Sequence, residues 1–230
     1  MDFGPNIAQV AALLGDPARA NMLSALMDGR ALTASELAYV AHVTPQTTSG
    51  HLAKLVDARL LAVEKQGRHR YYRLASALVA RALEGLMAVA ETGPARRAPH
   101  WRGGDDLRTA RSCYDHMAGR LAVGVADALV ESGHVVLQED GGALTPEGMA
   151  HFEALGINLA GWPARRVFCR PCLDWSERRP HLAGVVGAAL FGHALDRGWL
   201  RRIRDSRALQ VTDAGRDGFG QAFGLRLPPG

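Results

Sequence analysis

Apolar residues recur at helical spacing through the first part of the chain, and short polar stretches separate the apolar runs. This pattern predicts two short helices over residues 7–14 and 17–26. A third helix is expected to begin after Thr33, and a fourth after Thr44. Only a short turn, residues 41–43, separates the last two helices, so their order is helix, turn, helix.

The predicted helix starts have the chemistry of helix caps. Asp16 and Thr44 each precede a proline, and a side-chain oxygen at such a position accepts a hydrogen bond from the first turn, while proline fits the first helical position. Thr33 is followed three residues later by Glu36, which is the spacing of a capping box. The fourth helix is predicted to run to about Leu60.

Two strand-like runs, residues 61–64 and 71–74, come directly after these helices. They flank the segment Lys65-Gln66-Gly67-Arg68-His69-Arg70, which predicts a hairpin with a glycine-containing tip. A hairpin in this place is the wing of a winged helix-turn-helix. The next predicted helix, residues 76–91, has more apolar surface than one small domain can hide, so it is the candidate dimerisation element.

The second half of the chain contains an internal repeat. The segment Cys113-Tyr114-Asp115-His116-Met117-Ala118-Gly119 reappears as Cys172-Leu173-Asp174 and, after six further residues, His181-Leu182-Ala183-Gly184. An apolar helix follows in both copies, then a hairpin, at residues 135–144 and 200–211, and then the motif Thr-x-x-Gly-x-x-x-Phe. The repeat predicts two helix-hairpin-helix units packed about a pseudo-twofold axis.

Residues 44–54 have the composition of a recognition helix. Such a helix needs small polar side chains near its N-terminus to reach base edges, with positive groups beside it for phosphates. The predicted wing is basic and has no acidic residue over residues 65–73, which favours contact with DNA. The alternative interpretation is a basic hairpin that is simply solvated. The predicted DNA-binding residues are Gln46, Thr47, Thr48, Ser49, His51, Lys54, Lys65, Arg68, His69, Arg70 and Arg73.

We therefore expect a mainly α-helical protein with small β-hairpins, of the α+β fold class, in two domains. The predicted divisions are a DNA-binding and dimerisation domain at residues 1–92, a linker at 93–105 and an effector domain at 106–227. Apolar residues make up 47% of the 230 residues, which is enough for two cores. No apolar run approaches the roughly 20 residues that span a bilayer, so we predict a cytoplasmic protein with no membrane partner.

Four short motifs of the N-terminal half are shared with one family: Leu13-Leu14-Gly15-Asp16-Pro17-Ala18-Arg19, Ser35-Glu36-Leu37-Ala38, Ser49-Gly50-His51-Leu52 with Leu55, and Gly67-Arg68 with Tyr71-Tyr72-Arg73-Leu74. Together they resemble the ArsR/SmtB family of winged-helix repressors over about residues 7–91. The resemblance implies a homodimer held by terminal helices, two recognition helices in successive major grooves of a palindromic operator, and repression relieved by a signal. The chain departs from the family at Arg59, where the family usually has glycine.

The metal sites known in that family cannot be carried over to this chain. Residues 33–43 contain no cysteine, and residues 76–91 contain no His, Cys or Asp. Sensing chemistry is therefore expected in the second domain. The chain has only three cysteines, an odd and small number that argues for reduced thiols rather than a disulfide framework.

Five residues of the second domain are the predicted ligands of zinc or another thiophilic metal. Cys169 and Cys172 have the spacing of half a tetrahedral zinc site, and Cys113 with His116 or His181 completes it. The same residues also fit a thiol of lowered pKa that responds to oxidants, or a purely structural role in the core.

Aromatic residues suggest a third kind of sensor, a pocket for a small organic effector. They are Trp162, Phe168, Trp175, Phe191 and Trp199, and their alternative role is ordinary core packing.

The prediction from sequence is a homodimeric DNA-binding repressor released from its operator by a metal ion, a thiol oxidant or a small organic inducer. One alternative is a constitutive architectural DNA-binding protein. A second alternative is a Cys/His enzyme fused to a DNA-binding domain. We expect no enzyme, because the chain has no glycine-rich phosphate loop, nucleophile elbow or His-Glu-x-x-His helix, and a repeat suits symmetrical structure better than one active centre.

Overall fold

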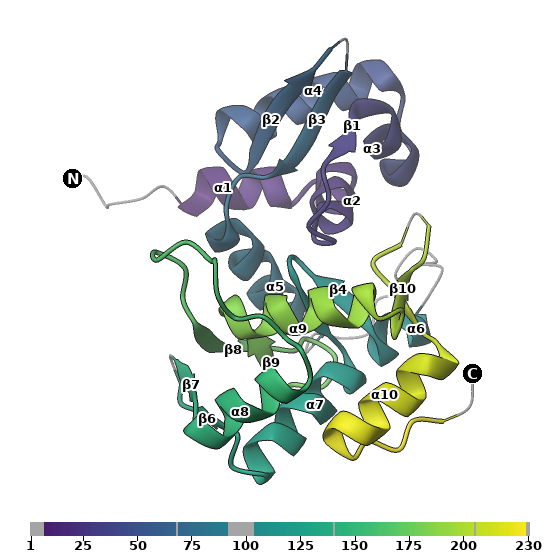
Figure 1. Cartoon of the computed structure of the whole chain (residues 1–230). Helices are drawn as coiled ribbons and strands as arrows, with labels where there is room; N and C mark the ends of the chain where they lie inside the picture. The colour runs from purple at the N-terminus through teal and green to yellow at the C-terminus, as the bar shows by residue number, and fades with distance from the viewer. Residues whose placement is uncertain (1–6, 68, 92–103, 140, 205, 229–230) are drawn as a thin grey trace, which may run out of the picture. The chain divides into compact units, whose positions relative to one another are not determined.

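The structure is a computed structural model that describes residues 7–67, 69–91, 104–139, 141–204 and 206–228. The chain divides into two compact units, residues 1–83 and 84–230, which are described separately (Figure 1). The border falls within helix α5 (Ala77–Glu91). Of the predicted linker, residues 93–103 lie outside the described residues, and its last two residues begin helix α6 (Gly104–Thr109).

Four helices build the N-terminal unit as predicted, and the last three have the predicted N-caps: α1 (Ile7–Leu14), α2 (Pro17–Leu26), α3 (Ala34–Ala41) and α4 (Pro45–Asp57). The backbone N–H of Arg19 donates to Asp16, and Thr33 and Glu36 form the predicted capping box. The backbone N–H of Thr47 donates to Thr44 at the start of α4. The core of this unit includes Met22, Leu23, Leu26, Leu37, Leu52, Leu55 and Leu74, whereas α1 has no buried residue.

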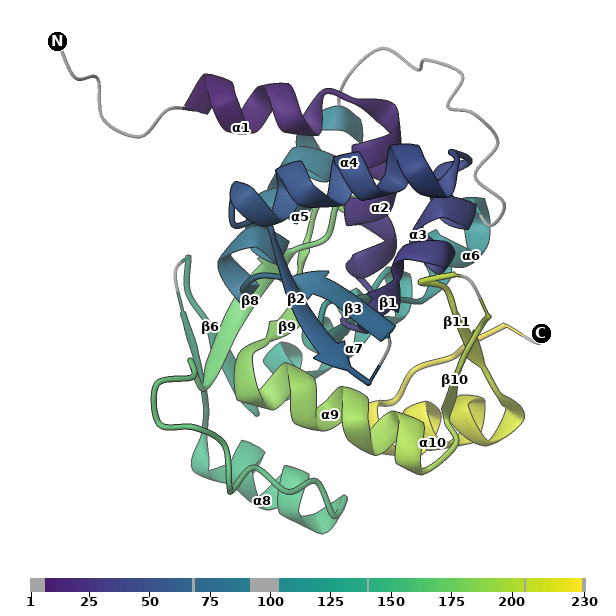
Figure 2. The same ribbon diagram turned by 90° about the horizontal axis from the view of Figure 1, so that it is seen from above.

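The wing is an antiparallel sheet with strand order β1-β3-β2, formed by β1 (Leu32–Thr33), β2 (Leu61–Gln66) and β3 (His69–Leu74) (Figure 2). Its strands are longer than predicted, because Gln66 lies opposite His69 and the turn between them is correspondingly short. Helix α4 ends at Asp57 rather than at Leu60. Arg59 then adopts a left-handed conformation with φ of 57°, which is the conformation that glycine provides most easily.

The C-terminal unit combines helices with three antiparallel sheets, so the α+β class is confirmed. Besides α6, its helices are α7 (Arg120–Glu131), α8 (Pro146–Ala154), α9 (Gly184–Asp196) and α10 (Asp213–Phe223). Hairpin β4–β5 (Arg111–Cys113, His116–Ala118) and hairpin β10–β11 (Leu200–Arg202, Leu209–Val211) are two-stranded. The third sheet has four strands in sequence order, β6 (Val135–Leu137), β7 (Gly142–Leu144), β8 (Cys169–Leu173) and β9 (Pro180–Ala183).

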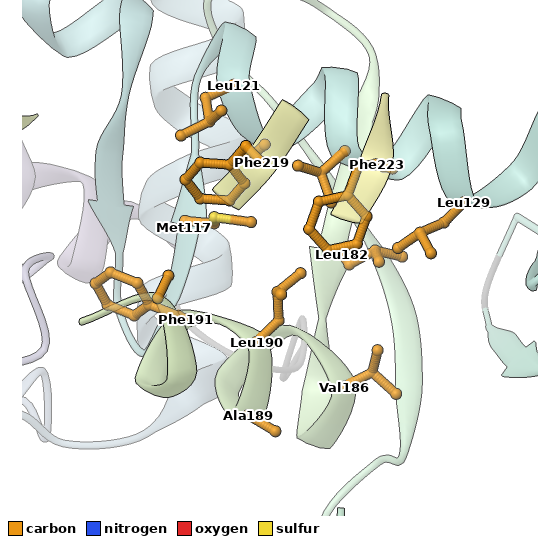
Figure 3. Packing of buried hydrophobic residues seen from close by; sticks show 14 of the residues in the cluster. Met117, Leu121, Leu129, Leu182, Val186, Ala189, Leu190, Phe191, Phe219 and Phe223 are labelled. Atoms are coloured by element: carbon orange, nitrogen blue, oxygen red, sulfur yellow. The ribbon is translucent and has the colours of Figure 1, made fainter. Parts of the chain in front are cut away.

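The core of this unit lies between α7, α9 and α10, and part of it is shown in Figure 3. Leu121 and Leu129 of α7, Leu190 of α9 and Phe219 and Phe223 of α10 belong to one buried cluster. Burial of such side chains is the main stabilising contribution to a fold of this size. Strand β5 leads directly into α7, and β9 leads directly into α9. The core therefore also fixes the positions of the β4–β5 and β8–β9 hairpins.

Within the described residues, no helix is both long and apolar enough to cross a bilayer.

Candidate nucleic-acid interface and Cys/His cluster

Helix α4 exposes much of the predicted recognition surface. Gln46, Thr47, Ser49 and Lys54 are exposed along it. Thr48 is the exception, because it is fully buried and its hydroxyl donates to the carbonyl of Thr44 at 2.9 Å. Its side chain therefore stabilises the first turn and is not available to a base edge.

His51 is also held by the protein. It is half-buried, and its Nδ1 lies 3.2 Å from Nη1 of Arg19. The same guanidinium donates through Nε to the carbonyl of Leu13 and through Nη2 to that of Ala12. His51 thus connects α4 to the junction of α1 and α2.

The wing presents a row of exposed basic side chains. Lys65, His69, Arg70 and Arg73 are exposed, while Arg68 lies outside the described residues. Lys65 stands directly opposite Arg70 in the β2–β3 ladder. Like charges placed opposite each other in a sheet repel, and a polyanion beside them relieves that repulsion.

Two helices carry apolar side chains in exposed positions. On α1, Ile7 is 79% exposed, and on α5, Leu78, Leu86 and Val89 are 64%, 49% and 67% exposed. Their spacing along α5 is close to the helical repeat, so they do not scatter at random over the surface. Apolar patches of this kind mark sites of protein association.

The C-terminal unit brings four of the five predicted metal ligands together. Cys113 faces His116 across the β4–β5 hairpin, and Cys172 faces His181 across β8–β9. One ligand atom from each of the four lies within 4.8 Å of all the others, and all four side chains are buried. We call these four residues the Cys/His cluster.

Cys169 does not belong to this cluster in the structure. It is buried in strand β8, three residues before Cys172. Successive side chains of a strand alternate between its faces, so residues three apart point to opposite sides. The Cys169–Cys172 spacing suits a metal-binding turn, but the segment is a strand, so the structure does not bring Cys169 to the side of Cys172 on which the cluster lies.

Each histidine of the cluster has a carboxylate beside its Nδ1. Asp115 Oδ1 lies 3.2 Å from Nδ1 of His116, and Asp174 Oδ2 lies 3.4 Å from Nδ1 of His181. Three buried ring nitrogens make no hydrogen bond: Nε2 of His116 and both nitrogens of His181. These three nitrogens are therefore buried polar atoms without a hydrogen-bond partner in the described part of the protein.

Asp174 is the centre of a second, fully buried network. It accepts hydrogen bonds from the backbone N–H of Gly119 at 2.7 Å and from Arg111 at 3.0 Å. The Arg111 guanidinium also binds Glu84 of α5 at 3.2 Å and lies over the Trp175 ring. The sequence shows Asp174 as a repeated residue and Arg111 as a positive charge near Cys113, but isolated charges give no signal of burial, so the buried network with Glu84 could not be predicted.

The cluster strongly shifts proton affinities. The adjacent Cys113 thiol, together with the imidazoles of His116 and His181, holds the pKa of Cys172 far below the usual range of a thiol. The contact with Cys172 and burial raise the pKa of Cys113. Burial acts to lower the pKa of His116, but Asp115 and Cys172 outweigh it and raise that pKa to about 9. The arrangement favours a thiolate at Cys172.

The predicted aromatic group is committed to packing. Trp199 lies against Phe219 with ring centroids 5.1 Å apart, and Trp175 covers the Arg111 guanidinium at 4.5 Å. Phe191 is buried in the core. Phe168 and Trp162 are partly exposed, and Arg166 lies over the Trp162 ring.

Comparison with known proteins places this chain among DNA-binding regulators. A family model described as a helix-turn-helix domain matches residues 14–64. An uncharacterised HTH-type transcriptional regulator of Bacillus subtilis, YdfF, is 43% identical over 226 residues, which is 98% of this chain and 100% of that protein. The relative is therefore similar across both units.

Solved structures match a smaller share of the chain. The cadmium sensor CmtR of Mycobacterium tuberculosis is 32% identical, with 41% of this chain and 96% of that one covered and a TM-score of 0.33. A homodimeric winged helix-turn-helix fragment of Mb0332 from Mycobacterium bovis, described as a possible ArsR-family regulator, is 26% identical, with 37% and 78% covered and a TM-score of 0.35.

Proposed function

Since this chain belongs to the HTH-type transcriptional regulators, we propose that it is a homodimeric repressor of the ArsR type that binds a palindromic operator and leaves it in response to an effector. The observation that carries the proposal is the capped helix α4, whose exposed polar face is followed at once by a basic wing. Gln46, Thr47 and Ser49 are the side chains that reach base edges. Lys54 and the wing arginines contact phosphates.

The dimer is supported by the exposed apolar residues of α1 and α5. We expect Leu78→Glu to weaken self-association, because it places a charge in the contact between protomers. Sedimentation equilibrium of the full chain measures this, with Val136→Glu as the matched control, since Val136 is a 49% exposed apolar residue on β6. Equal dissociation by both variants would place the dimer contact elsewhere.

Binding to DNA is tested by selecting a preferred duplex from a random pool and measuring fluorescence anisotropy at several salt concentrations. Arg70→Ala should weaken binding to every duplex and lower the salt slope by about 1, because a phosphate contact releases a counterion. Arg201→Ala, an exposed arginine on β10, is the control. An unchanged slope for Arg70→Ala would contradict the phosphate contact.

Recognition of the DNA base sequence by α4 is tested on the same selected duplex. Gln46→Ala should relax the preference at one or two base pairs of each half-site, at a cost of about 1–3 kcal/mol, because a base-edge contact is lost. Gln210→Ala, which removes an exposed glutamine on β11, should change nothing. Equal losses on selected and random duplexes would contradict a base-reading role for Gln46.

The effector acts on the C-terminal unit. The Cys/His cluster of that unit offers ligands for a metal ion and thiols for an oxidant. Trp175 and Trp199, which were predicted to line an organic pocket, pack against other side chains instead. Loss of operator binding with one of these agents separates the repressor from an architectural DNA-binding protein, whose affinity would not respond.

We also infer that the C-terminal unit arose from two copies of one element. Thr145 and Thr212 support this, because each hydroxyl accepts from a backbone N–H three residues later and donates to the carbonyl of a glycine that ends the preceding helix. Both copies have the order hairpin, helix, hairpin, helix.

A further inference from the structure

We propose that Cys113, His116, Cys172 and His181 bind one Zn²⁺ ion, or a thiophilic ion with the same tetrahedral preference, in a closed four-ligand site. The inference deepens the proposed function, because it names a metal site in the effector unit. Its evidence is the side-chain geometry of that unit, so it can be tested separately from DNA binding.

The spacing of the four ligand atoms fits a tetrahedral ion. Zinc is bound by thiolate at about 2.3 Å and by imidazole nitrogen at about 2.0–2.1 Å, which sets neighbouring ligand atoms roughly 3.3–3.8 Å apart. In the structure no pair of these atoms is farther apart than 4.8 Å. Only a small contraction is therefore needed, and the hairpin registers already hold each cysteine opposite its histidine.

The unpartnered ring nitrogens point to a cation. Nε2 of His116 and both nitrogens of His181 are buried without a hydrogen bond. Leaving such an atom unsatisfied costs about 1–3 kcal/mol. A cation that replaces the ring proton and accepts the Nε2 lone pair of each imidazole satisfies these two atoms, and it leaves Nδ1 of each ring beside its carboxylate.

The surrounding carboxylates complete the arrangement that zinc-bound histidines use. A ligating histidine commonly presents its other ring nitrogen to a carboxylate, which fixes the ring and raises its basicity. Asp115 stands at Nδ1 of His116 and Asp174 at Nδ1 of His181. Asp115 and Asp174 are therefore positioning residues, one for each hairpin.

Charge and donor type decide the class of ion. The charges of two thiolates offset that of a divalent ion, and the two imidazoles bind it as neutral ligands, which suits a buried site. Thiolate ligands select zinc and other thiophilic ions over Mg²⁺ and Ca²⁺, which prefer oxygen. Because all four positions come from protein side chains and all are buried, the site has no open position for a substrate.

The test uses the full chain, purified under reducing conditions and stripped of metal with a chelator. Titration with Co²⁺ should give the visible absorption of a tetrahedral ion with thiolate ligands, saturating at one equivalent per chain, and Zn²⁺ should abolish it. Cys172→Ser should lose this spectrum, and Cys169→Ser, which changes a buried cysteine outside the cluster, should keep it. Absence of tetrahedral absorption in the wild type, or equal loss in both variants, would overturn the site.

A second measurement does not depend on the folding of a variant. X-ray absorption of the zinc-loaded wild type should count two sulfur and two nitrogen ligands, whereas three sulfurs would bring in Cys169 and overturn the proposed set. Operator binding is measured on the same samples. A chain that binds Co²⁺ as described but binds no duplex refutes the repressor alone, and a chain that binds duplex without the metal spectrum refutes this site alone.

Discussion

Residues 111–154 and 169–223 of the C-terminal unit follow the same order of elements, yet their interiors are filled by different side chains. In the first half, His134 stacks on His151 with ring centroids 4.5 Å apart. At the corresponding places of the second half, Trp199 lies against Gly218, where a Cβ would stand only 2.1 Å from the indole. In the second half the large Trp199 packs against glycine, whereas in the first half two rings of equal size stack. The backbone arrangement is therefore the same in both halves, and only the side chains that fill the interior differ.

The two hairpins of the Cys/His cluster differ in the same way. Asp115 is 33% exposed and binds Arg166, which is itself partly exposed. Asp174 is fully buried and binds the fully buried Arg111. The comparison shows that one carboxylate stands at the rim of the unit, where water screens its charge, and the other forms part of the core.

The largest effect is expected from Asp174→Ala, with Asp115→Ala as the comparison in the other hairpin. Asp174→Ala leaves Arg111 without its closest partner in the core, and breaking a buried pair in this way costs about 3–5 kcal/mol. Asp115→Ala breaks a pair that water screens, so its cost should be about 1 kcal/mol or less. Urea unfolding followed by tryptophan fluorescence measures both, because all four tryptophans lie in residues 84–230. Equal losses would remove the distinction between the hairpins.

A smaller and equal effect is expected at two equivalent glycines. A Cβ on Gly148 would lie 2.0 Å from the carbonyl oxygen of His134, and one on Gly215 would lie 2.1 Å from that of Trp199. Each Gly→Ala change should cost about 1–3 kcal/mol, because a backbone carbonyl has to move. Gly192→Ala is the control: it lies inside α9 with open space around it, and the helix propensity of alanine should make it neutral or stabilising. Strongly unequal costs at Gly148 and Gly215 would argue against two copies of one element.

The smallest effect should be the pH dependence that His151 contributes in the first half. Burial, and then the charge of the stacked His134, lower the pKa of His151 below its ordinary value of 6.5. The unfolded chain therefore binds the proton more tightly, so stability is present above pH 6.5 and declines as the pH falls from 6.5 through the folded pKa. His151→Gln should flatten this decline in urea unfolding. An unchanged slope between pH 7 and pH 5 would contradict the pKa shift.

The N-terminal unit could be predicted closely because its signals are local. Asp16, Thr33 and Thr44 each cap a helix through a residue three positions away, and the sequence shows both partners. Even the departure at Arg59 marks a real feature, since this residue takes the left-handed conformation at the end of α4. The burial of Thr48 could not be predicted, because it depends on how α4 packs rather than on any neighbour in sequence.

The C-terminal unit was less predictable for a physical reason. Strands β4, β5 and β9 are short and almost wholly buried, and β8 is buried only at its two cysteines, so none of the four has the alternating pattern that identifies a strand. The repeat did indicate which cysteines and histidines correspond, and four of them do meet. Because the sequence does not show where these strands lie, however, Cys169 could not be excluded as a metal ligand. For the same reason the ion pair between the buried Arg111 and Glu84 could not be predicted.

The separation of the two hairpins along the chain has a consequence for synthesis on the ribosome. The first hairpin supplies Cys113 and His116, while His181 follows only after α7, the β6–β7 hairpin, α8 and β8 have been translated. A nascent chain that has emerged only as far as α8 holds one cysteine and one histidine of the four, and these offer a weak and open half-site. The complete cluster can assemble only late in translation, so truncated products cannot acquire it, and the Cys113 thiol lacks its cluster partners Cys172 and His181 until the second hairpin is made.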